Sequence, residues 1–145
     1  MPRYSLYCFF MLNLFCTPIL AAAPRTDYGN VRIDEVTSIY DGDTIRVTIR
    51  AWPAVAGERV PVRLYGIDTP ELRDKRPRVY DLAKRAKQFS VARLRGAKHI
   101  ELRQIRRDKY FRLLAEVWVD GLNLSDLLLK AGLAKPYFGD RKASW

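Results

Sequence analysis

Alternation of apolar and polar residues recurs along the chain and predicts five strands. In residues 44–49, Ile45, Val47 and Ile49 fall on one face of a strand and polar side chains fall on the other. A change of phase between Ile33 and Val36 predicts a bulge or bend within the first strand. The predicted strands are 31–39, 44–49, 60–67, 99–105 and 112–119.

Two segments repeat their apolar residues at helical spacing instead. The first lies between Pro77 and Gly96, and the second begins at Ser125 and stops at Gly132. Glycine just after a helical segment is typical of a helix end. Three strands, a helix, two strands and a helix suit a mainly β (α+β) domain, a five-stranded Greek-key barrel of the OB type with flanking helices. A generic α+β sandwich is the alternative.

The first 23 residues have the composition of a targeting segment. Arg3 precedes a largely apolar run over residues 6–20, and three alanines follow at 21–23. This order is typical of a secretory signal peptide, so we expect an exported, periplasmic or secreted protein. The alternative is an N-terminal membrane anchor, although a spanning helix needs roughly 20 apolar residues. After residues 1–23 we expect a flexible lead-in (24–30), one domain (31–138) and a short C-terminal tail (139–145).

The chain is strongly basic, with a formal net charge of +10. Residues 73–109 carry 14 lysines and arginines against four acidic residues, which favours a polyanionic partner. An ordinary solvated face and a surface that binds lipid head groups are the alternatives. The two cysteines, Cys8 and Cys16, lie in the predicted signal peptide, and His99 is the single histidine. No Cys/His or Ser/His/Asp constellation therefore competes in the mature part, and His99, at the start of a predicted strand, is interpreted as incidental.

Acidic residues stand at the ends of two predicted strands and could hold a metal ion. Asp43 and Asp68 offer hard carboxylate oxygens, which suit one divalent cation. Glu71 follows closely and could orient or deprotonate a water molecule. Each motif also has a purely structural interpretation, because Asp41-Gly42 is a turn signal and Pro70 makes the segment after Asp68 a turn.

Two arginines complete a set of groups suited to phosphodiester chemistry. The guanidinium groups of Arg63 and Arg112 are planar and permanently charged, and they match phosphate oxygens. Charge accumulates on the phosphate oxygens in the transition state, so positioned cations lower the barrier. These groups together suffice for metal-assisted hydrolysis without a covalent nucleophile.

Four motifs together resemble the staphylococcal nuclease (thermonuclease) family in order and spacing. They are Asp41-Gly42-Asp43-Thr44, the run from Arg63 to Glu71 (RLYGIDTPE), Asp108-Lys109-Tyr110-Phe111-Arg112 and Gly132-Leu133-Ala134-Lys135. The resemblance implies an OB-fold nuclease that cleaves DNA or RNA and leaves 3′-phosphate ends. The loop at residues 51–59, with its Trp-Pro pair, is similar to an exported bacterial subgroup of that family.

The resemblance also implies roles for individual residues. Calcium would be held by Asp43, Asp68 and the backbone carbonyl of Thr69, with Asp41 beside these ligands. Arg63 and Arg112 would hold the scissile phosphate, and Glu71 would act on the attacking water. The residues near the rest of the substrate would be Lys109, Tyr110 and Tyr137.

This sequence departs from the family pattern at two places near the expected site. Phe111 replaces the glycine that the family usually has before Arg112. Tyr137 is shifted by one position from the place where the family has a tyrosine that stacks on the base. The main alternative function is a non-catalytic OB-fold module that binds single-stranded nucleic acid. The survival of Asp43, Asp68, Glu71 and the arginines favours the nuclease. We expect a monomer without an obligate protein partner, in contact with a membrane only if the N-terminal segment is not cleaved.

Overall fold

The computed structural model describes residues 27–142, 144 and 145. The predicted signal peptide or membrane anchor therefore lies outside the described residues. Within the described part of the chain, no helix is long and apolar enough to cross a membrane.

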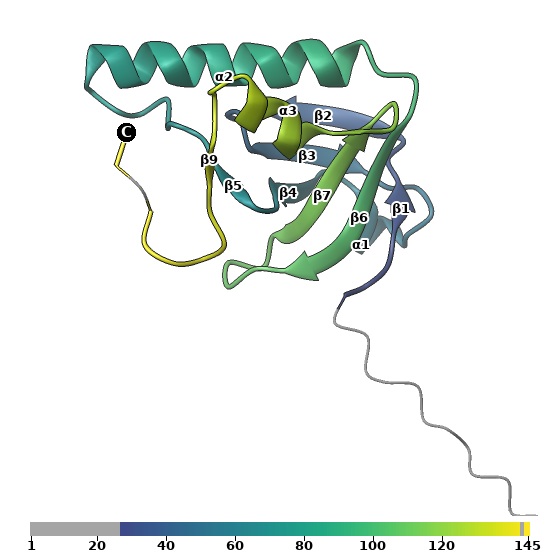
Figure 1. Cartoon of the computed structure of the whole chain (residues 1–145). Coiled ribbons are helices and arrows are strands. Elements are labelled where there is room, and N and C mark those ends of the chain that lie inside the picture. The colour runs from purple at the N-terminus through teal and green to yellow at the C-terminus, as the bar shows by residue number, and fades with distance from the viewer. Residues whose placement is uncertain (1–26, 143) are drawn as a thin grey trace, which may run out of the picture.

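The described residues form nine strands and three helices (Figure 1). In chain order they are β1 (Val31–Arg32), β2 (Glu35–Ile39), β3 (Thr44–Thr48), α1 (Ala54–Gly57), β4 (Val60–Leu64), β5 (Ile67–Asp68), α2 (Pro77–Arg95), β6 (Ile100–Arg107), β7 (Leu113–Val119), β8 (Leu122–Asn123), α3 (Leu124–Lys130) and β9 (Lys135–Pro136). Both helices predicted from the apolar spacing are present within two residues of their expected bounds.

The main sheet has the strand order β1-β6-β7-β4-β3-β2, with β8 added beside β7. Its strands pair antiparallel except β4 and β7, which run parallel. The sheet curls into a partly open barrel, and α2 and α3 lie together across one end of it (Figure 1). The mainly β, OB-type fold with flanking helices is thus confirmed.

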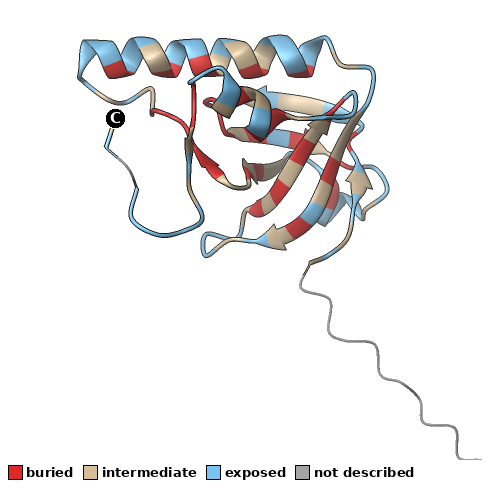
Figure 2. Ribbon diagram, viewed as in Figure 1, coloured by how far each residue is buried: buried red, intermediate tan, exposed pale blue. Residues whose placement is uncertain are grey.

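The core lies inside the curled sheet and beneath α2 (Figure 2). Along β7 every second side chain is buried, as expected for a strand with one face toward the core. On α2 the buried side chains recur every three or four residues, so one stripe of the helix faces the sheet. These stripe residues are Val79, Ala83, Ala86, Ser90 and Leu94.

The structure divides two of the predicted strands into shorter pieces. The first is interrupted at Ile33 and Asp34, close to the expected bend. The third ends at Leu64 and resumes at Ile67, because Gly66 adopts a φ of +82° and turns the chain. Asp68 therefore stands on β5, which pairs with β9 outside the main sheet.

Three short elements have no counterpart in the prediction. Helix α1 lies in residues 51–59, for which the sequence predicts a loop, and β8 and β9 are two residues long each. Strand β6 continues to Arg107, beyond the predicted end, with a register shift where Gln104 has a φ of +50°. The shift is a β-bulge, which lets the strand bend without ending.

Candidate active site

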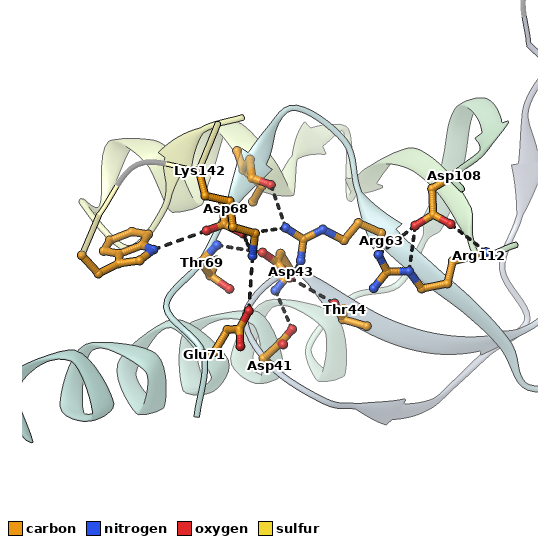
Figure 3. Close-up of polar contacts among 12 residues, drawn as sticks. Asp41, Asp43, Thr44, Arg63, Asp68, Thr69, Glu71, Asp108, Arg112 and Lys142 are labelled. Atoms are coloured by element: carbon orange, nitrogen blue, oxygen red, sulfur yellow. Dashed lines mark hydrogen bonds and ion pairs between the residues drawn. The ribbon is translucent and has the colours of Figure 1, made fainter. Parts of the chain in front are cut away.

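A groove of about 700 Å³ opens beside β3, β4 and the hairpin between β6 and β7. Seven of the residues predicted from the sequence line it, namely Asp41, Arg63, Glu71, Lys109, Tyr110, Arg112 and Tyr137. The other three are buried: Asp43 and Asp68 contact Arg63, and Thr69 contacts Asp43. The fold therefore brings all the predicted site residues together from five separate segments. Figure 3 shows seven of them, namely Asp41, Asp43, Arg63, Asp68, Thr69, Glu71 and Arg112.

The loop that carries Asp43 is fixed by its contact with α2. A Cβ atom on Gly42 would lie 2.9 Å from Ala86 Cβ and 2.9 Å from Thr69 Cγ2, so only glycine fits there. The buried Ser90 hydroxyl donates a 2.7 Å hydrogen bond to the Gly42 carbonyl. Gly42 is required for this close approach of the helix, in addition to the turn that the sequence predicts.

The Asp43 carboxylate is fully buried and surrounded by donors. Its Oδ2 accepts a 2.7 Å bond from the Thr69 backbone N–H, and its Oδ1 accepts from the Thr44 hydroxyl and forms an ion pair with Arg63. Burial raises the pKa of Asp43 to about 7, and the neighbouring Asp41 adds to the rise, while Arg63 opposes it. Asp43 is therefore a carboxylate that further positive charge would stabilise.

The guanidinium group of Arg63 bridges the two buried aspartates (Figure 3). Its Nη1 pairs with Asp43, and its Nη2 lies 2.8 Å from Asp68 Oδ1. Burial alone would lower the pKa of Arg63, but the two aspartates raise it. The two carboxylate partners of Arg63 and its own basicity keep the guanidinium group charged.

Asp68 reaches the site from β5 and is held from two further sides. Lys142 Nζ lies 2.9 Å from its Oδ1, and the indole N–H of Trp145 lies 3.4 Å from its Oδ2. Burial would raise the pKa of Asp68, but hydrogen bonds from Lys142 and Arg63 outweigh burial and lower it. Asp68 is therefore ionised at neutral pH.

Glu71 follows Pro70 and faces the groove with a more accessible carboxylate. It pairs with Arg73, and its Oε1 lies 3.2 Å from Lys142 Nζ. The hydrogen bond from Arg73 is the main cause that lowers the pKa of Glu71. Glu71 is thus available in its ionised form as a proton acceptor for a water molecule in the groove.

The hairpin between β6 and β7 presents Arg112 to the same groove. Asp108 holds this arginine, since its Oδ2 accepts from Nε at 2.8 Å and its Oδ1 from the backbone N–H at 3.0 Å. Lys109 Nζ lies 5.3 Å and Arg112 Cζ lies 5.4 Å from the centroid of the Tyr110 ring, and Tyr110 is 66% exposed. Phe111 at the tip has a φ of +62°, the left-handed conformation that glycine adopts without strain.

Tyr137 closes the groove on the side of β9, where its backbone N–H donates to the Gly66 carbonyl at 2.9 Å. The adjoining Phe138 is exposed and meets Tyr65 edge to face at 5.7 Å. Together with Leu114 these rings line a smaller, adjoining pocket of about 270 Å³. A pocket lined partly by aromatic side chains therefore lies beside the cationic groove.

The chemistry of the donor set fits a hard divalent cation. Carboxylate oxygens of Asp43 and Asp68 are the ligands that calcium and magnesium prefer. Thr69 directly follows Asp68, and its buried Oγ1 has no hydrogen-bond partner within the described part of the structure. In that same part, no group of three acidic, histidine or cysteine side chains could hold an ion. An ion here would therefore need a backbone carbonyl, water or substrate oxygens as further ligands.

Sequence reasoning did not identify three residues that contact the predicted site. Asp108 is the first residue of one of the four family motifs, and its position four residues before Arg112 could have indicated the ion pair. Lys142 and Trp145 reach Asp68 from more than 70 residues away along the chain. Nothing in the local pattern indicates these contacts.

Comparison with known proteins identifies the family. The model of the family described as "Staphylococcal nuclease homologue" matches residues 61–144, more than half of the chain. The chain belongs to the staphylococcal nuclease family. This match includes every predicted site residue after Asp43 and agrees with the resemblance of the motifs. Membership of the exported subgroup stays a prediction.

Several known proteins align with this chain. It is 38% identical over 111 residues to "Endonuclease YncB" of Bacillus subtilis (73% of this chain, 47% of the relative). It is 41% identical over 100 residues to "SPbeta prophage-derived endonuclease YokF" of the same organism (66% and 31%). The "Thermonuclease" of Staphylococcus hyicus is 32% identical over 111 residues (76% and 62%). The chain thus spans between about a third and three fifths of the length of these relatives.

Proposed function

We propose that the protein is a calcium-dependent nuclease that hydrolyses phosphodiester bonds of DNA or RNA and leaves 3′-phosphate ends. The observation that carries the proposal is the bridge of Arg63 between the buried carboxylates of Asp43 and Asp68, at the floor of a groove that also presents Arg112 and Glu71. Three family members with endonuclease or thermonuclease names support a nucleic-acid substrate.

The two arginines both line the groove and would bind the scissile phosphate there. Arg112 is held in place by Asp108, so its guanidinium group loses little freedom when a phosphate binds. Arg63 is anchored on β4 and can turn one N–H edge from the aspartates to a phosphate oxygen. Both groups would stabilise the negative charge that grows on the phosphate oxygens in the transition state.

Asp43, Asp68 and the Thr69 carbonyl would hold the calcium ion. When bound, the ion would neutralise phosphate charge and favour attack by water. It would also offset the cost of burying two carboxylates, which Arg63 offsets in this structure. Asp41 lies beside Asp43, with its Oδ1 accepting from the Asp43 backbone N–H at 3.3 Å, and would support the loop without binding the ion.

Glu71 would accept a proton from the attacking water or hold that water in line with the phosphate. Its lowered pKa keeps the carboxylate ionised, which this role requires. Lys109 and Tyr110 would contact a terminal phosphate of the substrate, and Tyr137 would contact a base. We further propose that the enzyme acts as an exported monomer.

A binding module without catalysis is the alternative in another class. Such a module needs the basic groove and exposed aromatic rings, but it gains nothing from the carboxylates of Asp43 and Asp68. Burying two carboxylates costs free energy, and acids at a phosphate site repel the ligand. The geometry therefore supports hydrolysis better than binding alone.

The test is incubation of fluorescently labelled single-stranded DNA and RNA with the protein in calcium, in magnesium and in EDTA. We expect cleavage in calcium, none in EDTA, and products that change mobility after phosphatase treatment because they end in 3′-phosphates. Cleavage that continues in EDTA would contradict the ion-dependent proposal. Tight binding without cleavage under all three conditions would favour the binding module.

A further inference from the structure

The segment that follows β9 folds back over the acidic side of the site. We name residues 139–142, 144 and 145 the strap; Figure 1 shows it in yellow, returning toward the beginning of α2. Lys135 Nζ donates to the Ser144 carbonyl at 2.6 Å and lies 4.6 Å from the Trp145 ring. Arg76 donates to the Trp145 carbonyl at 2.9 Å. The strap is therefore attached at its far end by exposed polar contacts.

Lys142 places an ammonium group between two acids of the site (Figure 3). Its Nζ lies 2.9 Å from Asp68 Oδ1 and 3.2 Å from Glu71 Oε1. The indole N–H of Trp145 approaches the other oxygen of Asp68 at 3.4 Å. Both oxygens of a proposed calcium ligand are thus in contact with the strap.

We propose that Lys142 competes with the divalent cation for Asp68, so that binding of the ion releases the strap from the site. The inference rests on the proposed function for the identity of the ion, but not on cleavage itself. It makes Lys142 a positioning residue, because it acts through Asp68 and Glu71.

The competition follows from geometry and charge. Calcium binds carboxylate oxygens at about 2.3–2.6 Å, so an ion on Asp68 Oδ1 would lie within a few ångströms of the ammonium group. Two cations that close repel each other strongly in a partly buried site. The side chain of Lys142 is half exposed, so water can solvate its ammonium group when it leaves the carboxylates.

Arg63 contacts the same aspartate but is the harder of the two cations to displace. It stands on β4 within the main sheet, its side chain is only 13% exposed, and it also contacts the Ile67 carbonyl. Lys142 stands on the strap, which is attached mainly by exposed contacts. An arriving ion therefore displaces the lysine, and the strap loses its central contact.

Release of the strap would change two openings of the site at once. Lys142 lines the main groove of about 700 Å³ and an adjoining pocket of about 370 Å³ that contains Asp68, Thr69 and Trp145. The ion would thereby open the acidic end of the groove as it binds. Substrate binding and ion binding would be coupled through the strap.

Calorimetric titration of the protein with calcium chloride, without substrate, tests the competition directly. We expect Lys142→Gln to tighten calcium binding roughly tenfold or more, because the site no longer has to lose the lysine before it binds the ion. Arg141→Gln is the matched control, since it removes the same charge from the same strap. Arg141 is exposed and makes no ion pair within the described part of the chain. We expect the calcium affinity of Arg141→Gln to stay within about twofold of wild type.

The fluorescence of Trp145 provides an independent readout. We expect calcium to shift tryptophan emission of the wild-type protein to longer wavelength as Trp145 leaves Asp68, and we expect Trp145→Phe to lack that shift. Before calcium is added, the emission of the Lys142→Gln variant should already lie closer to that of the calcium-bound wild-type protein. Unchanged or weaker calcium affinity in Lys142→Gln would overturn the inference, as would equal tightening in Arg141→Gln or calcium binding without an emission change.

The two proposals fail in distinguishable ways. Tighter calcium binding in Lys142→Gln without cleavage of nucleic acid by any variant would support the strap and contradict the nuclease. Calcium-dependent cleavage with equal calcium affinity in all variants would support the nuclease and contradict the strap. No calcium binding by wild type or Lys142→Gln would overturn both.

Discussion

The buried hydroxyl of Ser90 on α2 donates a 2.7 Å hydrogen bond to the carbonyl of Gly42, in the loop that carries Asp43. This bond joins the helix to the acidic part of the site. The helix thus positions the loop directly, although none of its own side chains lines the groove.

Loss of the Ser90 hydroxyl should destabilise the protein. Ser90→Ala leaves the Gly42 carbonyl without its partner in a buried place, which costs about 1–3 kcal/mol. We expect this decrease in the free energy of unfolding in urea, measured in EDTA. The exposed Ser38→Ala on β2 is the control and should change the value by less than about 0.5 kcal/mol. An equal effect of both substitutions would contradict the role of this bond.

Phe111 should be replaceable with a gain in stability. Its φ of +62° is strained for any residue with a Cβ atom, and its side chain is 79% exposed, so little packing is lost on removal. We expect Phe111→Gly to raise the free energy of unfolding by about 1 kcal/mol. Phe111→Ala keeps the strain and should leave stability nearly unchanged. Destabilisation by Phe111→Gly in denaturant melts would show that the ring has a packing role.

Removal of the Arg112 guanidinium group should affect turnover far more than stability. Arg112→Ala deletes a cation from the phosphate site, and we expect turnover of single-stranded DNA to fall by about 10³-fold or more. Arg95→Ala removes an exposed arginine at the end of α2 and is the control, expected to stay within a few-fold of wild type. Turnover of Arg112→Ala within that same range would contradict the assignment of Arg112.

The contribution of Asp74 to stability should disappear in acid. Hydrogen bonds from the Arg76 side chain are the largest cause that lowers the pKa of Asp74 from 3.8 to about 2. A carboxyl group with a lowered folded-state pKa stabilises the fold above its unfolded pKa, and that stability is lost as pH falls from 3.8 toward 2. Asp74→Asn should therefore lower the Tm at pH 6 and lower it much less at pH 2, where the folded-state carboxyl group is already partly protonated.

The exposed Asp140→Asn serves as the matched control for Asp74→Asn, because Asp140 forms no ion pair with the described residues. It should leave the Tm unchanged at both pH values. If Asp74→Asn lowered the Tm as much at pH 2 as at pH 6, the charge of Asp74 would not be the cause of the decrease.

Much of the fold was predictable because long, regular elements carry their own periodicity. Strand β7 and helix α2 show their buried faces in the sequence itself. Helix α1 and strands β8 and β9 escaped prediction because elements of two to four residues have no period to detect. The break after Leu64 depends on Gly66 and on pairing of β5 with the distant β9, which no local pattern encodes.

The site was predictable where chemistry and motif coincide, and not where the chain folds back on itself. Asp43, Arg63, Asp68 and Arg112 could be named because catalysis at a phosphodiester needs acids and arginines together. Lys142 could not, since a lysine in a basic chain has no distinguishing local signal. Its contact with Asp68 exists only through the path of the strap.

The most direct test of the account is single-turnover cleavage of labelled single-stranded DNA in calcium by wild type and Glu71→Gln, with binding measured separately. The nuclease account predicts that Glu71→Gln slows cleavage by about 10²–10⁴-fold and retains binding, because only the water-activating carboxylate is lost. Glu58→Gln, an exposed acid after α1, should cleave like wild type. Cleavage by Glu71→Gln at the wild-type rate would contradict the claim that this acidic site is catalytic.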